Sequence, residues 1–335
     1  MTRQLQAPQA GEVALVDAPD AALGPGEVRL AVSHCGICGS DLHWFNGRGL
    51  LPAFCPGHEM SATVGECGDG VQGWAQGDRV AVEPLARCCT CARCLGGDYH
   101  LCSNARLFGI HLPGGMADSL VVPAYCLHRL PVQLSSELGA LAEPLAVGVH
   151  AARLGAVGPG SRVLILGGGA VGLLAAVAAQ ELGADRVTIT ARYDHQKELA
   201  GLIGCDRVLA PDEVYHLDHQ PSVVIETVGG SATTVADAVA VLEPGGRIIM
   251  VGLFEQTPSF SPLIAVIKEV HIVASMVYNK TAEQSDFETA LDILVKRREV
   301  LASLVTHRFP LDDAQEAFSA AADKSSGAVK VLLSP

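Results

Sequence analysis

Four cysteines that lie close together constrain the fold of this chain more than any other feature. They follow the spacing C-x2-C-x2-C-x7-C and are Cys88, Cys91, Cys94 and Cys102. Four thiolates complete the tetrahedral shell of a structural zinc ion and leave no coordination position for a substrate. The spacing therefore predicts a short lobe folded around one structural zinc, with the neighbouring Cys89 outside the ligand set.

Disulfides and a nucleic-acid-binding zinc ribbon are the alternative interpretations of this cluster. The chain has 335 residues and an odd total of 11 cysteines, and its N-terminus shows no apolar core of signal-peptide length. These features favour a reducing compartment, so we expect a cytoplasmic protein without disulfides. The formal net charge of −13 argues against a nucleic-acid partner, because nucleic-acid modules need a basic face to neutralise phosphates.

The composition is that of a globular chain with large cores. Apolar residues make up 49% and charged residues 18%, and this length favours two domains. The most apolar stretch, from Val163 to Ala179, contains four glycines and is a poor membrane span. A parallel strand that leads into a buried helix explains it better, and no membrane association is expected.

The pattern of strands and helices changes along the chain. Up to about residue 147, short strands punctuated by Gly and Pro predict an antiparallel barrel-like domain. From about Val149, strands alternate with helices, which predicts a doubly wound α/β domain with a six-stranded parallel sheet. We expect domains at 1–148 with 281–335, and at 149–280. The expected strands are Glu27 to Val32, Asp78 to Val82, Ala117 to Val122, Arg162 to Leu166, Arg186 to Thr190, Arg207 to Leu209, Ser222 to Glu226, Arg247 to Val251, Val270 to Val277 and Ala328 to Leu332, and the expected helices start at Ala170, His195, Ala232 and Glu283.

A glycine-rich segment follows the first of these parallel strands. It reads G-x-G-x-x-G, from Gly167 through Gly169, Ala170 and Val171 to Gly172, and it opens an apolar helix. This context is typical of dinucleotide binding: the glycines turn the chain, admit the pyrophosphate and allow the helix to pack on the strand. A glycine-rich turn needed only for packing is the alternative.

The end of the next strand bears on the choice of cofactor. An NAD enzyme places Asp or Glu about 20 residues after the glycines, where it accepts a hydrogen bond from the ribose 2′-hydroxyl. This chain has Ala191, Arg192 and Tyr193 there, with Lys197 in the following turn. Arg192 suits a 2′-phosphate, so NADP(H) is favoured over NAD(H). Asp194 is a competing ribose ligand, and Arg192 could also be an ordinary surface arginine.

A second set of metal-binding residues precedes the cysteine cluster. Cys38 and the pair His58-Glu59 carry the ligand types of a catalytic zinc that keeps one position open. Taken singly, a histidine or a cysteine in a loop is more often a packing residue.

Several of these segments together resemble one family. The runs GICGSDLH, GHE, the four-cysteine lobe, LAEPLAVGVH and GGGAVG occur in the order found in zinc-containing medium-chain dehydrogenases/reductases. The chain is most similar to the branch of sorbitol, 2,3-butanediol and threonine dehydrogenases, and the similarity covers essentially its whole length. The resemblance implies a GroES-like antiparallel β-barrel catalytic domain joined to a Rossmann domain.

The resemblance also assigns the metal ligands. Cys38 and His58 match ligands of the catalytic zinc, and Glu59 matches a carboxylate that binds the metal directly or through water. Glu143 matches the third protein ligand of the polyol branch. Together with the structural zinc of the four-cysteine lobe, this catalytic zinc makes an expected total of two zinc ions per chain. Asp41 matches a carboxylate that orients the ligand histidine.

Further roles follow from the same resemblance. Ser40 and His43 match a proton relay, although a turn serine and a surface histidine are the simpler interpretations. Trp44 and Phe45 lie where members of the family have residues that line the substrate pocket, and ordinary packing is the alternative interpretation. His34, Cys35 and Cys55 are interpreted as packing residues near the site. The full set of predicted cofactor contacts is Gly167, Gly169, Ala170, Val171, Gly172, Ala191, Arg192, Tyr193, Lys197, Val228, Val251 and Gly252.

The expected function is hydride transfer between a nicotinamide cofactor and a secondary alcohol or polyol, or the matching ketone or aldehyde. A zinc-independent quinone or enoyl reductase, an NAD-preferring threonine or polyol dehydrogenase, and a non-catalytic protein on the same fold are the alternatives. A small-molecule substrate and a homodimer or homotetramer are expected.

Overall fold

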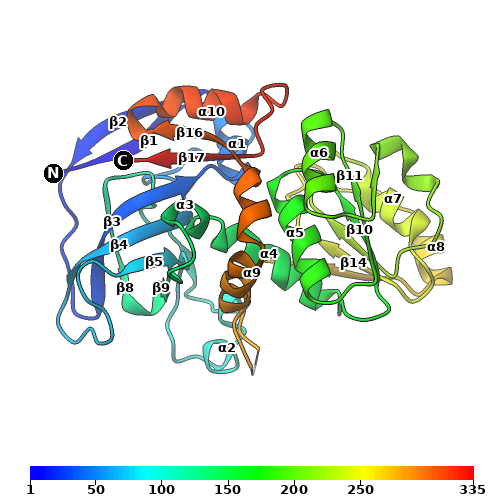
Figure 1. The fold of residues 1–335 in the computed structure, drawn as a ribbon, viewed down its shortest axis with the longest axis horizontal. Helices are drawn as coiled ribbons and strands as arrows, with labels where there is room; N and C mark the ends of the chain where they lie inside the picture. The colour runs from blue at the N-terminus through cyan, green and yellow to red at the C-terminus, as the bar shows by residue number, and fades with distance from the viewer. Residues whose placement is uncertain (282) are drawn as a thin grey trace. The chain divides into compact units, whose positions relative to one another are not determined.

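The computed structural model describes residues 1–281 and 283–335 (Figure 1). The chain forms two compact units, one made of Met1–Glu143 with Asn279–Pro335 and the other of Pro144–Tyr278. Among the described residues no helix is long and apolar enough to cross a membrane. All eleven cysteines are free thiols.

The first unit is built on a seven-stranded sheet. Its strands follow the order β16-β17-β3-β4-β5-β9, and β8 also pairs with β3. All pairs are antiparallel except β16 with β17, which confirms the predicted antiparallel domain. The strands of this unit are β1 (Thr2–Gln9), β2 (Glu12–Ala18), β3 (Glu27–Gly36), β4 (Glu59–Cys67), β5 (Arg79–Val82), β6 (Leu85–Ala86), β7 (Arg106–Leu107), β8 (Ser119–Pro123), β9 (Leu127–Arg129), β16 (Val305–Pro310) and β17 (Lys330–Ser334).

The C-terminal tail completes this sheet. β17 pairs with β3, so the last residues of the chain lie beside the strand that leads to Cys38. Apolar residues of β3, β4, β5 and β8 form a buried core together with helix α10. The helices of the unit are α1 (Gly39–Phe45), α2 (Ala92–Leu95), α3 (Ser136–Gly139), α9 (Asp286–Leu301) and α10 (Ala314–Ala322), and α4 (Ala142–Leu154) continues into the second unit.

The second unit is the predicted doubly wound domain. Six parallel strands follow the order β12-β11-β10-β13-β14-β15, and helices cover the sheet on both faces (Figure 1). The strands are β10 (Arg162–Leu166), β11 (Arg186–Thr190), β12 (Arg207–Leu209), β13 (Val223–Glu226), β14 (Arg247–Met250) and β15 (His271–Ala274), and the helices are α5 (Ala170–Glu181), α6 (Asp194–Leu202), α7 (Thr234–Val241) and α8 (Pro262–Ile267).

The apolar runs of the sequence explain this architecture. The inner residues of β10, including Leu164 and Ile165, are fully buried, as expected for a strand with helices on both faces. α5 packs on β10, β11 and β13. The sheet order reverses between β10 and β13, and a crevice at such a switch point is where open α/β sheets bind ligands.

Candidate active site

Three predicted metal ligands converge in the first unit. Cys38 follows β3 and is the N-cap of α1, His58 immediately precedes β4, and Glu59 is its first residue. Pairing of β3 with β4 places Gly36 opposite Glu59, which brings the two segments together. One ligand atom from each of Cys38, His58 and Glu59 lies within 4.8 Å of the others. Glu143 is outside this tight set.

Buried charge surrounds these three residues. The carboxylates of Asp41, Glu59 and Glu143 are all buried, and Lys330 is a buried cation beside them. The Lys330 ammonium donates to both oxygens of Glu59, at 2.6 and 2.5 Å, and to the Ile37 carbonyl. Glu59 is therefore held by a lysine at the position where the sequence predicts a metal ligand.

The titration behaviour of the cluster reflects this crowding of charges. Burial acts to lower the pKa of His58, but the negative groups around it, Cys38 first, raise that pKa well above its ordinary value. Burial raises the pKa of Glu143 to about 7, although the positive charge of His58 opposes this. The site thus contains more buried acidic groups than buried cations.

The residues present fit a zinc ion. A thiol, an imidazole and carboxylates are the donors of catalytic zinc sites. The Nδ1 atom of His58 is buried and has no hydrogen-bond partner among the described residues. A dication would satisfy ligand atoms in this cluster and offset its excess of carboxylates.

The neighbouring residues of α1 have distinct contacts. The Oγ atom of Ser40 lies 3.4 Å from Nε2 of His58. Asp41, which the resemblance assigns to orienting His58, accepts a hydrogen bond from the Cys38 backbone N–H at 2.9 Å and so caps the helix. Trp44 and Phe45 are buried and pack against Phe318, with ring centroids 5.2 and 5.1 Å away. Their contacts are those of core packing.

Two further cysteines near the site are buried thiols. Burial raises the pKa of Cys55 to about 12, and it also raises the pKa of Cys35 well above the usual range. Neither belongs to the convergent set of Cys38, His58 and Glu59.

The four predicted structural ligands form a second cluster. Cys91 is the N-cap of α2, Cys94 lies in that helix, and Cys102 follows a short 3-10 helix. Their sulfur atoms and that of Cys88 all lie within 4.8 Å of one another. Cys88 Sγ lies 3.8 Å from Cys94 Sγ and 3.5 Å from Cys102 Sγ. Those spacings fit a tetrahedron with zinc–sulfur bonds of about 2.3 Å, whose edges measure about 3.8 Å.

Backbone groups prepare this lobe for a cation. Hydrogen bonds from the backbone at Thr90 and Cys91 lower the pKa of Cys88 to about 6, which favours the thiolate that binds metal. Burial and the neighbouring thiols raise the pKa of Cys94 to about 12. Cys89 is exposed, has a positive φ of 60° and lies outside the cluster, as the spacing predicts.

The glycine-rich segment of the second unit forms a strand–turn–helix. Gly167 has a φ of +114°, and a Cβ at Gly172 would lie 1.9 Å from the Gly167 carbonyl oxygen, so a side chain at 172 would collide with the turn. A Cβ at Gly169 would meet nothing within 4 Å. Gly169 caps α5 without a side chain, and first-turn N–H groups of a helix have no acceptor within it. Open space above free N–H groups suits a pyrophosphate.

The other predicted cofactor residues lie at the same edge of the sheet. Ala191 to Tyr193 follow β11, Val228 follows β13, and Val251 with Gly252 follows β14. Arg192 is exposed, and its guanidinium has no partner in the described part of the chain. Lys197 instead pairs with Asp194 at 2.9 Å. Among the described residues Arg192 is thus a cation without a charged partner next to the buried Ala191.

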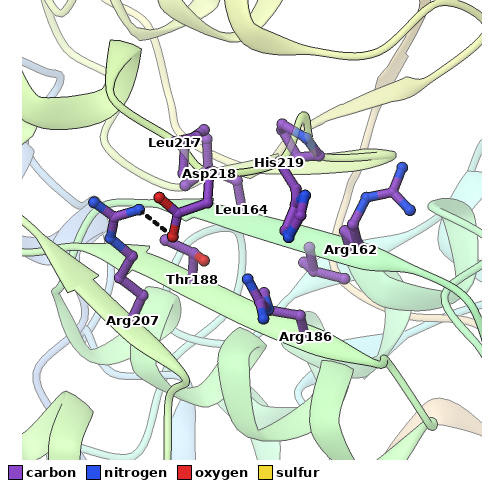
Figure 2. A pocket seen from close by; sticks show the side chains of 10 residues that line it. Arg162, Leu164, Arg186, Thr188, Arg207, Leu217, Asp218 and His219 are labelled. Atoms are coloured by element: carbon purple, nitrogen blue, oxygen red, sulfur yellow. Dashed lines mark ion pairs between the residues drawn. The ribbon is translucent and has the colours of Figure 1, made fainter.

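A small recess lies at the opposite edge, where the strands begin. It encloses about 20 Å³, enough for little more than a water molecule. Figure 2 shows Arg162, Arg186 and Arg207, the first residues of β10, β11 and β12, around it. Arg207 pairs with Asp218 at 2.9 Å, and Arg162 pairs with Glu243. The recess lies at the opposite end of the strands from the glycine-rich turn, and two of its arginines are already paired with carboxylates. It is therefore not the cofactor site.

Sequence reasoning missed Lys330 at the first site. The signal that could have found it is a single lysine inside the apolar run of the last strand, since a buried lysine needs an acidic partner. Its partner Glu59 is 271 residues away, so no local pattern connects them.

Known proteins match both units. The family model described as "Alcohol dehydrogenase GroES-like domain" matches residues 24–132, and "Zinc-binding dehydrogenase" matches 170–296. Sorbitol dehydrogenase of Halalkalibacterium halodurans is 32% identical, covering 97% of this chain and 96% of its own. L-idonate 5-dehydrogenase of Vitis vinifera is 32% identical, covering 92% and 88%.

Solved structures agree with the fold. A zinc-binding dehydrogenase from Sinorhizobium meliloti 1021, solved bound to NADP, superposes with a TM-score of 0.89 at 29% identity, covering 100% of this chain and 99% of that one. These matches confirm the GroES-like and Rossmann domains. The chain belongs to the zinc-type medium-chain dehydrogenases, in their sorbitol and polyol branch, and is an oxidoreductase of the alcohol dehydrogenase type.

Proposed function

We propose that this protein is a zinc-dependent oxidoreductase that prefers NADP(H) and acts on secondary alcohols or polyols and the matching carbonyl compounds. The observation that carries the proposal is the convergence of Cys38, His58 and Glu59 within 4.8 Å. Residues 1–148 with 281–335 form the catalytic domain of this proposal, and 149–280 bind the dinucleotide. The similarity to sorbitol and L-idonate dehydrogenases supports the substrate class.

Each residue of the first site has a task in this proposal. Cys38 and His58, with Glu59 or Glu143, hold the catalytic zinc, and Cys88, Cys91, Cys94 and Cys102 hold a structural zinc. When bound, the catalytic zinc supplies Lewis-acid polarisation of the substrate oxygen, and the nicotinamide takes up or donates the hydride. The Ser40 hydroxyl, beside His58, accepts the proton of the substrate hydroxyl and releases its own proton to His43. His43, one turn further along α1, passes it towards solvent.

The ion pair of Lys330 bears on which carboxylate, Glu59 or Glu143, is the third protein ligand of the zinc. Its two short contacts to Glu59 neutralise that carboxylate in the absence of metal. A zinc ion that binds through Glu59 has to compete with Lys330, whereas no cation of the described residues donates a hydrogen bond to Glu143. We therefore favour Glu143 as the third ligand and Glu59 as a carboxylate held close to it.

The surface of the second unit supports the cofactor preference. Ala191 carries no carboxylate that would repel a 2′-phosphate, and Arg192 is exposed beside it. Asp194, the competing ribose ligand, has a side chain that is 90% exposed and paired with Lys197. This geometry leaves Arg192 available to a phosphate group.

Replacing Arg192 should change the affinity for NADP selectively. In Arg192→Ala we expect a loss of about 10- to 150-fold for NADP, because a charge-assisted contact contributes about 1.5–3 kcal/mol. NAD binding should scarcely change. Ala191→Asp should favour NAD, since it adds a 2′-hydroxyl acceptor and repels the phosphate. The ratio of kcat/KM for the two cofactors measures both effects, with Arg186→Ala at the opposite edge as the control.

A wild type that already prefers NAD would contradict this cofactor assignment. Equal weakening of both cofactors in Arg192→Ala would do the same and would make Asp194 the next candidate for the ribose contact.

A panel of substrates tests the reaction itself. Secondary alcohols, diols, sugar alcohols and 3-hydroxy amino acids, each with NAD and NADP, should produce reduced cofactor with at least one class, and metal analysis should find two zinc ions per chain. A zinc-free quinone or enoyl reductase would instead reduce those acceptors with no bound metal. A non-catalytic protein would turn over nothing with metal present.

The proposal also includes a cytoplasmic homo-oligomer. Eleven free thiols suit a reducing compartment. β15 is an edge strand, and the adjacent helix α8 exposes Leu263, Val266 and Ile267, which together offer an apolar surface for a second copy.

A further inference from the structure

A carboxylate that the proposed mechanism does not use lies fully buried at the end of β13. Glu226 has no exposed surface. One of its oxygens, Oε1, accepts hydrogen bonds from the backbone N–H groups of Val228 and Gly229, at 2.8 and 3.0 Å, and from the Thr234 hydroxyl at 2.8 Å. A single oxygen thus fixes both the loop after β13 and the first residue of α7.

These bonds determine which groups the loop presents. The peptide bonds of residues 226–229 are trans, and in a trans peptide the C=O points opposite to the N–H. Because the N–H groups of Val228 and Gly229 point at Glu226, the carbonyls of Thr227 and Val228 point away from it. Glu226 therefore sets the orientation of the loop that carries Val228, one of the predicted cofactor contacts.

The same segment is attached to the two neighbouring loops. The Thr227 hydroxyl donates to the Leu166 carbonyl at 2.8 Å, and a Cβ at Gly167 would lie 2.7 Å from that hydroxyl oxygen. On the other side, the N–H groups of Val251 and Gly252 donate to the Glu226 carbonyl. The glycine-rich turn and the loops after β13 and β14 are thus joined through residues 226 and 227.

The second carboxylate oxygen of Glu226 indicates that this arrangement lowers the stability of the folded protein. Oε2 is buried and has no hydrogen-bond partner in the described part of the chain. A Cβ at Gly252 would lie 2.5 Å from it, so the bare Gly252 backbone covers this oxygen. A buried carboxylate without a cation opposes folding, while charge-assisted hydrogen bonds to it are about twice as strong as neutral ones. A neutral side chain would fill the same space at lower cost.

We propose that Glu226 is a positioning residue that holds the loops after β13 and β14 in the conformation that binds the dinucleotide. The inference rests on the proposed function, because it assumes that these loops contact the cofactor. It assigns to Glu226 an effect on NAD and NADP alike, since the residue lies at the end of β13 and not beside Arg192.

Glu226→Ala should weaken both cofactors by about tenfold or more, because three hydrogen bonds to the carboxylate are lost together. Dissociation constants are measured by fluorescence titration at a temperature where circular dichroism shows the variant folded. Hydrogen exchange of the cofactor-free protein should be faster in peptides covering 227–234 and unchanged in peptides covering β3 and β4. Glu226→Gln keeps an acceptor at Oε1 and should restore most of the affinity and protection.

A second pair of variants covers a failure of Glu226→Ala to fold. Thr234→Val removes one donor and should weaken both cofactors, whereas Thr234→Ser keeps the hydroxyl and should bind like wild type. Unchanged dissociation constants and unchanged exchange in folded Glu226→Ala, or in Thr234→Val, would overturn the inference. Failure of the wild type to bind either cofactor would refute the proposed function instead, and the exchange experiment would still report whether Glu226 holds the loop.

Discussion

Replacing Cys38 with serine should abolish turnover in a protein that remains folded. Cys38 is the N-cap of α1, and its Sγ is one of the three convergent donors of the first site. A serine hydroxyl is a far poorer zinc ligand than a thiolate. We expect kcat/KM to fall by at least about 10³-fold, because Lewis-acid polarisation contributes several kcal/mol and each 1.36 kcal/mol is a factor of ten. The zinc content should fall from two ions to one.

The effect should be confined to chemistry. The dinucleotide residues lie in the other unit, so cofactor binding should match that of wild type. Cys67→Ser is the matched control: Cys67 is the last residue of β4, its Sγ faces the Trp74 carbonyl, and it belongs to neither cysteine cluster. Near-normal turnover in Cys38→Ser, with its zinc lost, would show that the reaction does not need this site.

The second unit was the more predictable part of the fold. Each parallel strand is a continuous apolar run between polar turns, and such a run defines its own limits. β10, β11 and β12 begin and end at the predicted residues. Differences occur at the ends of other elements: α6 starts at Asp194 and not at His195, α7 starts at Thr234 and not at Ala232, and β15 spans His271–Ala274, shorter than the predicted Val270 to Val277.

The first unit was predicted only in outline. β6 and β7 contain two residues each and are held by their mutual pairing, so no periodicity marks them. β16 was not predicted at all, because its sequence VTHRFP has no apolar alternation and its place depends on parallel pairing with β17. Short strands of this kind are determined by tertiary pairing, which a local pattern does not contain.

The same distinction separates the site residues. The cysteine cluster and the glycine-rich turn are local in sequence, and the structure brings each of them together as the spacing indicates. The ion pair between Lys330 and Glu59 joins the two ends of the chain, and the hydrogen bonds of Glu226 depend on loops whose conformation the sequence does not show. In the sequence, Lys330 and Glu226 stand out only as charged residues within apolar strands, and nothing there indicates their partners.

Replacing Cys94 with serine should remove the metal of the lobe and destabilise the first unit. Cys94 contacts the sulfur of Cys88 at 3.8 Å, and its own backbone N–H donates to Cys91 Sγ. Structural zinc contributes folding energy directly, about 10–16 kcal/mol in small zinc-finger peptides. In a lobe attached to a larger core we expect a loss of several kcal/mol, with one zinc remaining per chain. Thermal unfolding and metal analysis measure both quantities.

The lobe provides its own control in Cys89→Ser. Cys89 lies in the same loop, but it is exposed and its sulfur is outside the cluster. This variant should keep both zinc ions and the wild-type melting temperature, because no metal bond and no buried contact is lost. If Cys94→Ser kept two zinc ions while Cys89→Ser lost one, the ligand set would include Cys89, and a thiol that is now exposed would have to turn inward. Equal stability of both variants and wild type, each with a single zinc, would show that the four cysteines bind no metal and that the lobe is held by its protein contacts alone.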